Sequence, residues 1–225
     1  EVQDGTCINT RTGNPIKAVV PMHAYGHPVD LDPLQEVCEQ YRLVLVEDAA
    51  ESLGSFYDGT HTGTIGPLGE LSFNGNKTIT SGGGGAILTD DDDLADEAKH
   101  LTTVAKKDYE WEYFHDKTGY NYRLPNLNAA LGCAQLEELP SFLDRKRALA
   151  ERYREAFADV DGVSFFAERE DTRSNYWLNV ILLDGNIADR RDDVLRVTNE
   201  AGFGTRPTWT LMGELPMYEE CPRMD

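Results

Sequence analysis

The sequence predicts an α/β protein built on a parallel-rich sheet, and three observations support this. Residues 17–22 and 43–47 are short apolar runs typical of buried strands. Between them, Asp32-Pro33-x-Gln35 resembles a capped helix start with proline at the first helical position, and the helix should end near Tyr41. A strand, a helix and a strand in this order form a crossover, which pairs the two strands in parallel.

The next segments extend this sheet. Residues 69–73 and 86–89 are predicted strands, with Lys77 and a glycine run at 82–85 between them. Four aspartates at 90–93 predict the start of a helix over 91–104, because carboxylates complement the positive end of the helix dipole. Residues 106–122 are rich in aromatic and charged side chains without a clean period, so we expect a long functional loop there.

A second, smaller domain is expected towards the C-terminus. One helix should start at Pro125, and Pro140 should start another that ends near Ala158. We then expect strands over 163–166, 176–183 and 203–206, and a helix over 192–200 capped by Gly202. The predicted boundary assigns residues 1–145 to part of a large domain and 146–225 to the small one.

Composition narrows the possible partners. The chain has 225 residues, with 21 basic and 40 acidic side chains and a formal net charge of −19. Such an excess of acid disfavours binding to nucleic acid or to an anionic membrane, because both need a basic surface. No long apolar run or signal peptide is visible, which favours a cytoplasmic protein.

The four cysteines, Cys7, Cys38, Cys133 and Cys221, are scattered along the chain. They form no pair with metal-ligand spacing, so we expect neither a metal site nor a disulfide framework. Cys38 and Cys133 fall in helical patterns and are expected to be small core residues.

The strongest chemical signal is the combination of Asp48 and Lys77. Asp48 follows the strand at 43–47, and ligands of parallel sheets bind beyond the carboxyl ends of the strands. Many folds hold pyridoxal phosphate with such a pair: the lysine forms a Schiff base with the aldehyde, and the aspartate keeps the pyridine nitrogen protonated. Taken separately, the pieces would favour a buried strand, a surface lysine and a flexible glycine loop.

Four motifs in a fixed order resemble the DegT/DnrJ/EryC1/StrS family of pyridoxal-phosphate sugar aminotransferases. They are residues 47–55 (EDAAESLGS), 63–66 (GTIG), 71–77 (LSFNGNK) and 119–124 (GYNYRL), and the similarity runs from Ile16 to Asp225. The chain is most similar to the branch that aminates C4 of nucleotide-linked 4-keto-6-deoxy sugars, such as the perosamine synthases and the aminotransferases of bacillosamine and legionaminic acid pathways.

The resemblance implies the aspartate-aminotransferase-like architecture of fold type I. It provides a parallel-rich sheet in the large domain and part of a small C-terminal α+β domain. Family members begin with a longer segment that cradles the cofactor phosphate, so the chain is expected to be incomplete at both ends.

The resemblance also implies roles for individual residues. Lys77 and Asp48 are the expected catalytic residues, and Lys77 would also move a proton between the substrate carbon and the cofactor. Glu51 would contact the ring hydroxyl of the cofactor, and Ser72 its phosphate. From the residues alone, Asp48 could instead cap a helix, and Glu51 and Ser72 could simply be solvated.

Other positions would complete a shared site. Asn121 and Arg123 match a motif that reaches across a dimer to the partner's phosphate, which implies a homodimer with shared active sites. His23 and Tyr25 lie in the loop after the first strand, and Trp111 and His115 lie in the aromatic segment; all four are expected to bind the nucleotide-sugar substrate. A hydrophobic anchor beneath a long loop is the alternative for the aromatic segment.

The implied reaction is transfer of an amino group from an amino acid, L-glutamate being the expected donor, to the C4 keto group of a nucleotide-linked 4-keto-6-deoxy sugar. A few members of the family are pyridoxamine-phosphate sugar dehydratases that replace the lysine by histidine, so Lys77 argues against that activity. A non-catalytic remnant or regulatory partner is the third possibility.

Overall fold

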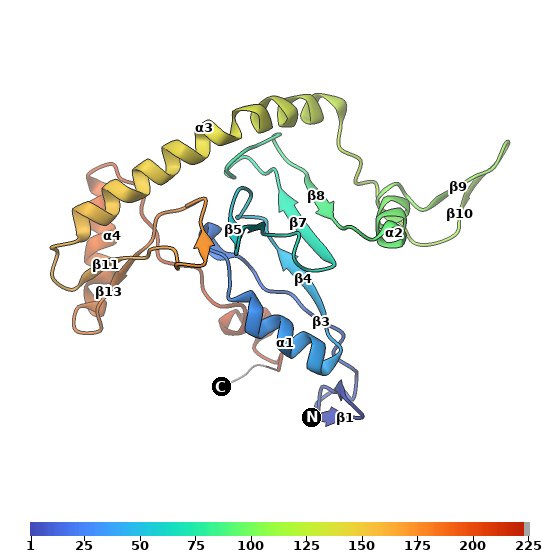
Figure 1. The fold of residues 1–225 in the computed structure, drawn as a ribbon, viewed down its shortest axis with the longest axis horizontal. Coiled ribbons are helices and arrows are strands. Elements are labelled where there is room, and N and C mark those ends of the chain that lie inside the picture. Colours follow the sequence, from blue (N-terminus) through green and yellow to red (C-terminus); the bar gives the residue numbers. More distant parts are fainter. Residues whose placement is uncertain (223–225) are drawn as a thin grey trace.

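A computed structural model of the chain describes residues 1–222 and has a four-stranded sheet at its centre (Figure 1). The order is β3-β4-β7-β8, formed by Ala18–Val19, Val44–Asp48, Leu68–Ser72 and Gly85–Leu88. Strands β3, β4 and β7 run parallel, and β8 is antiparallel to β7. The α/β class and the parallel-rich sheet are therefore confirmed.

Helix α1 (Leu31–Tyr41) connects β3 to β4 and provides much of the core. Leu31 and Cys38 of the helix are buried with Leu45 of β4 and Tyr57. Asp30 occupies the N-cap position, so Pro33 is the third helical residue. The expectation that it would be the first was wrong. Proline is still tolerated there because the first helical N–H groups have no partner within the helix.

Strand β3 is shorter than predicted and less buried. It comprises two residues of the predicted 17–22, and Val20 is 63% exposed. The reason is its place in the sheet: β3 is an edge strand, so it has a neighbour on one side only.

The elements that flank Lys77 agree with prediction to within one or two residues. Strands β7 and β8 pair in register, with Ser72 opposite Gly85, and Lys77 lies in the loop that joins them. Helix α2 (Asp92–Thr102) begins at the aspartate run, and the Asp91 carboxylate accepts a hydrogen bond from Leu94 N at 3.0 Å. The aspartate run is therefore a helix start.

The loop expected over residues 106–122 was wrong in part, because a hairpin forms within it. Strand β9 (Lys106–Asp108) pairs antiparallel with β10 (Tyr113–His115), and the hairpin projects away from the sheet (Figure 1). Each strand has three residues and is largely exposed, so neither face needs the apolar alternation by which strands are recognised.

Helix α3 (Asn126–Phe157) begins directly after Pro125, as expected, but continues through Pro140. The expected second start at Pro140 was therefore wrong. Proline removes one backbone hydrogen bond, and the remaining bonds of this 32-residue helix maintain its course.

The C-terminal part is less regular than predicted. Strands β11 (Val163–Phe165) and β13 (Ile181–Leu183) pair antiparallel, and α4 spans Arg191–Glu200. The strand predicted over 176–183 is limited to its last three residues, and the positive φ of 46° at Tyr176 excludes that residue from an extended strand. No strand forms at 203–206, where the Thr205 hydroxyl instead pairs with Thr198 at 2.5 Å.

The remaining elements are short. Strand β12 (Thr172–Arg173) pairs with β5 (Phe56–Tyr57), which pairs with β6 (Thr60–His61), and β1 (Val2–Gln3) pairs with β2 (Thr6–Cys7). The 3₁₀ turns are η1 (Ala24–Gly26), η2 (Ala188–Arg190), η3 (Met212–Glu214) and η4 (Pro216–Tyr218).

None of the four cysteines forms a disulfide bond. All four are free thiols; Cys38 is buried as predicted, whereas Cys133 is exposed on α3, so its predicted core role was wrong. Within residues 1–222, no helix is long and apolar enough to cross a membrane, and no group of three or more His, Cys, Asp or Glu side chains could hold a metal ion.

Candidate active site

Lys77 lies in the β7–β8 loop with its amine largely enclosed. The Nζ atom donates to Glu51 Oε1 at 3.4 Å, and the Lys77 side chain is 14% exposed. On the other side, Nζ lies 4.3 Å from the centre of the Trp177 ring. The amine is thus held between a carboxylate and an aromatic face, which is not the environment of a solvated surface lysine.

Three carboxyl groups gather around this lysine. Asp48 ends β4, where it accepts a hydrogen bond from Ala50 N at 3.1 Å, and its partner on β7 is Glu70. Burial raises the pKa of Glu70, and the charge of Asp48 and a hydrogen bond between Glu70 and Asp48 raise this pKa further. The positive charge of Lys77 opposes the rise. Burial likewise raises the pKa of Glu51, although a hydrogen bond from Tyr25 N and the Lys77 charge oppose it.

Glu70 was not singled out from the sequence. Its position two residues before Ser72 places it on the same face of β7 as that residue, which is a usable signal. Its pairing with Asp48, however, depends on the register between β4 and β7, and sequence does not specify that register.

His23 and Glu47, the residue before Asp48, form a fully buried pair. His23 Nε2 donates to Glu47 Oε2 at 3.0 Å, and Val29 N donates to His23 Nδ1 at 3.2 Å. Both ring nitrogens therefore have partners within the chain, and the expected contact of His23 with substrate stays a prediction. Its role in the structure is to hold Glu47 and the loop that leads to Val29.

Glu47 also organises the glycine turn at residues 63–66. Its carboxylate accepts hydrogen bonds from Gly63 N, Ile65 N and Gly66 N, each at 2.7 Å. Burial opposes ionisation of Glu47, but the hydrogen bonds from His23 and from these three amides outweigh it and lower its pKa. The 63–66 motif is thus fixed by a carboxylate adjacent to Asp48 in the sequence.

Tyr25 belongs to the same cluster as Lys77. Its backbone N–H donates to Glu51 Oε2 at 2.8 Å, and its ring lies 4.7 Å from the ring of Trp209. Trp209 in turn lies 6.1 Å from Trp177, the ring beneath Lys77. Sequence reasoning missed both tryptophans, since nothing local distinguishes them.

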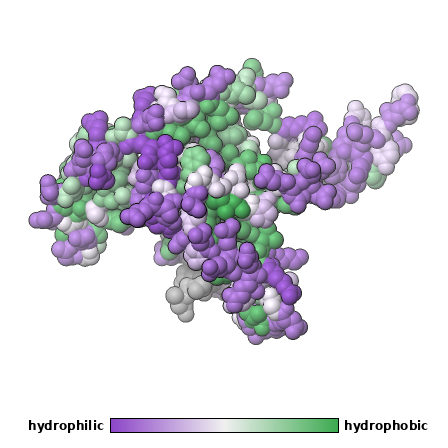
Figure 2. Space-filling view, viewed as in Figure 1, coloured by the Kyte–Doolittle hydropathy of each residue, from purple (hydrophilic) through white to green (hydrophobic). Residues whose placement is uncertain are grey.

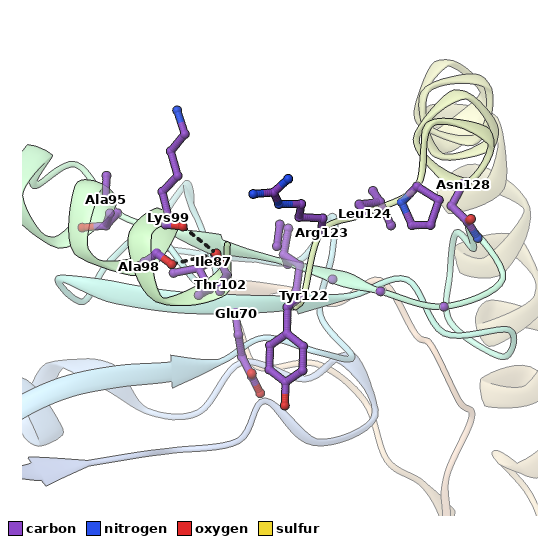
Figure 3. A pocket seen from close by; sticks show the side chains of 17 residues that line it. Glu70, Ile87, Ala95, Ala98, Lys99, Thr102, Tyr122, Arg123, Leu124 and Asn128 are labelled. Atoms are coloured by element: carbon purple, nitrogen blue, oxygen red, sulfur yellow. Dashed lines mark hydrogen bonds between the residues drawn. The ribbon is translucent and has the colours of Figure 1, made fainter. Parts of the chain in front are cut away.

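Ser72 ends β7, whereas Asn121 and Arg123 lie in the segment that leads to α3. The Ser72 hydroxyl, at the end of β7, accepts a hydrogen bond from Asn74 N at 3.3 Å. Asn121 bridges to Thr103, next to a cavity of about 820 Å³ that Arg123 lines together with Glu70. Figure 3 shows that the side chains of Tyr122 and Arg123 point in opposite directions, and that Tyr122 lies on the side of the Glu70 carboxylate.

Trp111 and His115 are not brought to this cluster. Trp111 is 85% exposed in the β9–β10 turn, and His115 Nδ1 contacts Val104 O at 2.7 Å. Among the described residues, no hydrogen bond or ion pair connects either of them to Lys77, Asp48 or Glu51.

The chain is similar in sequence to known aminotransferases. Residues 5–224 match the DegT/DnrJ/EryC1/StrS aminotransferase family. The GDP-perosamine synthase of Vibrio cholerae is 38% identical over 215 residues, which cover 94% of this chain and 56% of that protein. The chain spans about half the length of the curated relatives it matches.

Solved structures show the same fold. Helicobacter pylori PseC, an aminotransferase involved in the biosynthesis of pseudoaminic acid, superposes with a TM-score of 0.87 at 25% identity, covering 95% of this chain and 57% of PseC. Spr1654 from Streptococcus pneumoniae in its PLP-form gives 0.84 at 25% identity, covering 91% and 57%. By sequence, fold and the enclosed Lys77, the chain belongs to the DegT/DnrJ/EryC1/StrS aminotransferase family.

Proposed function

We propose that this chain carries the catalytic lysine of a pyridoxal-phosphate-dependent aminotransferase. The observation that carries the proposal is the Lys77 amine, held 3.4 Å from Glu51 and 4.3 Å from the Trp177 ring centre. The proposed reaction moves an amino group from an amino acid, with L-glutamate as donor, to the C4 keto group of a nucleotide-linked 4-keto-6-deoxy sugar. The similarity to GDP-perosamine synthases supports this substrate class.

The residues present fit pyridoxal phosphate. A largely enclosed amine is available for the aldehyde, a carboxylate lies at the carboxyl end of β4, and a hydroxyl lies at the end of the adjacent β7. We assign these positions to Lys77, Asp48 and Ser72, with Glu51 near the ring hydroxyl. When bound, the cofactor supplies an aldehyde that condenses with amines and a ring that withdraws electrons.

The residues of the chain would perform the remaining steps. Lys77 Nζ, once free, would carry a proton between the substrate carbon and the cofactor, because a lysine in an enclosed site can act as a base. Asp48 would hold a proton at the ring nitrogen of the cofactor, and its own orientation is fixed by Ala50 N. Tyr25, bonded to Glu51 through its backbone, would contact the sugar.

A second copy of the chain is part of the proposal. Large apolar side chains are exposed on the β9–β10 hairpin and on α3, including Trp111 and Leu127 at 85% and 87%. Figure 2 shows hydrophobic residues at the surface along α3. Asn121 and Arg123 would reach the partner's phosphate, and Trp111 and His115 the partner's sugar site.

The proposed domain boundary at residues 145 and 146 falls inside α3. The helix would then belong to both domains, with its first part beside the sheet and its last part beside β11 (Figure 1). The pairing of β12 with β5 also crosses the proposed boundary, because the two strands lie on either side of it in the sequence.

Borohydride trapping tests the proposal. The protein, expressed from its whole coding sequence, is incubated with pyridoxal phosphate, reduced, digested and mapped by mass spectrometry. We expect the label on Lys77 and its loss in Lys77→Ala. A label on Lys99, Lys106 or Lys107 instead would contradict the assignment, and no specific label would favour a non-catalytic protein.

The amino-group half reaction tests the donor. Added L-glutamate should yield 2-oxoglutarate in one equivalent per site, and a nucleotide-linked 4-keto-6-deoxy sugar should then accept the amino group. Release of water from the sugar without transfer of nitrogen would instead indicate a dehydratase.

A further inference from the structure

Trp177 contacts the loop that carries Lys77 at two points. Its indole Nε1–H donates to Asn76 O, the carbonyl just before Lys77, at 2.7 Å. Its ring lies 4.3 Å from Lys77 Nζ. One side chain, itself only 5% exposed, therefore touches both the backbone at the root of the lysine and the amine at its tip.

Asn175 holds Trp177 in place. Its Oδ1 accepts a hydrogen bond from Trp177 N at 2.7 Å, while its Nδ2 donates to Glu51 O at 2.8 Å and to Leu53 O at 2.9 Å. Asn175 is fully buried, so these bonds have no competition from water. The segment that carries Trp177 is thus tied to the turn that follows Asp48.

The site that receives Asn175 is closely shaped to it. Ser55 Oγ accepts from Asn175 N at 2.9 Å and donates to Gly26 O at 2.7 Å. A Cβ on Gly26, whose φ is +91°, would lie 1.8 Å from Asn175 Oδ1. On the other side, Lys146 of α3 donates to Trp177 O at 3.1 Å. The segment is therefore fixed from the 23–27 loop and from α3 at once.

We propose that Trp177 is a positioning residue for Lys77 and that Asn175 fixes Trp177 in the position this requires. The inference rests on the proposed role of Lys77 as the catalytic amine. A lysine side chain has four rotatable bonds, and reaction needs the amine at one place and in one orientation. The indole N–H fixes the start of the side chain, and the ring face restricts where the charged amine can lie.

The role has a kinetic consequence. The Trp177 side chain contacts the lysine loop directly, whereas the ring of Trp209 lies between it and Tyr25, which is proposed to contact the sugar. Loss of positioning should therefore lower kcat of the amino-group half reaction and leave KM within about twofold, since an interaction needed mainly in the transition state is being removed.

Two variants remove the indole donor, one with a smaller aromatic ring and one with a side chain of the same size. Trp177→Phe keeps an aromatic ring near Nζ, and replacement of Trp177 by benzothienylalanine substitutes sulfur for the N–H in a side chain of the same size. Tyr57→Phe is the matched control: Tyr57 is also 5% exposed, and its hydroxyl bonds Asp32 N and Asp30, at the start of α1.

Three measurements are made on the protein expressed from its whole coding sequence. Hydrogen exchange of amides 74–80 reports the loop, reductive methylation with formaldehyde and cyanoborohydride reports Lys77 Nζ, and the glutamate half reaction gives kcat and KM. In both Trp177 variants we expect roughly tenfold faster exchange, as loss of one buried hydrogen bond allows. The rate at which Lys77 is methylated should change at least threefold, and kcat should fall roughly tenfold or more. Tyr57→Phe should leave all three unchanged.

The outcomes separate this inference from the proposed function. Unchanged exchange and methylation in both Trp177 variants would overturn the positioning role, whatever the activity. A KM that rises with kcat constant would also overturn it, because that result indicates a binding residue. If wild-type Lys77 is not trapped by pyridoxal phosphate, the proposed function fails, while exchange and methylation still decide whether Trp177 positions the lysine.

Discussion

Replacing Glu47 by glutamine should destabilise the fold far more than the loss of one charge suggests. The carboxylate is fully buried and accepts four hydrogen bonds. Glutamine keeps one oxygen, which can still serve Ile65 N and Gly66 N. Its NH₂ group would then face Gly63 N–H and His23 Nε2–H, which are both donors. His23 cannot offer a free nitrogen by changing tautomer, since Val29 N donates to Nδ1.

The expected cost follows from these bonds. Hydrogen bonds to a charged group contribute about 1.5–3 kcal/mol each, so two lost bonds amount to about 3–6 kcal/mol. A neutral side chain is easier to bury, which places the expected value towards the lower end. For a chain of this size the midpoint of thermal unfolding should fall by roughly 10 °C.

Denaturant unfolding at neutral pH measures the effect, with Glu97→Gln as control. Glu97 pairs with Lys117 at 2.7 Å on the surface, where ion pairs contribute about 0–1 kcal/mol. The pH dependence gives a second check. Because the pKa of Glu47 is lowered in the folded state, its stabilisation is present above the ordinary carboxyl pKa and is lost as the pH falls through the lowered one. The wild type and Glu47→Gln should therefore converge in acid. A difference below about 1 kcal/mol at neutral pH would refute the argument.

Three further substitutions have defined outcomes. Gly26→Ala should cost about 2–4 kcal/mol in denaturant unfolding, because the new Cβ would meet Asn175 Oδ1 at 1.8 Å; a neutral effect would contradict the tight fit. Burial raises the pKa of Glu51, so the wild type should lose stability as the pH rises from the ordinary carboxyl value through the raised one; Glu51→Gln should flatten that part of a thermal-shift profile, and an unchanged slope would count against it. Arg147→Met should cost about 1–3 kcal/mol by leaving the half-buried Glu168 carboxylate without its two guanidinium bonds, and Arg147→Met with Glu168→Met should recover part of it; simple additivity would refute the coupling.

Local patterns predicted the elements of this fold that have strong local causes. The apolar run of β4, the aspartates at the start of α2 and Pro125 before α3 each act within a few residues. The β9–β10 hairpin was missed because its short exposed strands need no apolar pattern. The helix through Pro140 was missed because its neighbours compensate for one lost hydrogen bond.

The candidate site shows the same division. Lys77, Asp48 and Glu51 were singled out from sequence motifs, and the structure brings Lys77 and Glu51 into contact. Trp177 was missed because its bond to Asn76 joins residues 101 positions apart, and no local pattern encodes such a contact. Glu70 depends on strand register, and the buried role of His23 depends on the position of Val29.

Helix α3 has a mechanical consequence for the loop that carries Lys77. Its 32 residues span about 48 Å. The helix bonds to the lysine loop from a residue before Pro140, and to the segment that carries Trp177 from a residue after Pro140. Asn128 donates to Ser81 O at the end of the lysine loop, and Lys146 donates to Trp177 O. The carbonyl of Leu136 faces Pro140, which has no N–H to offer, so the helix bends most easily there. Bending at that point would displace the two supports relative to each other, so a change in the course of α3 would be transmitted to the loop that carries Lys77.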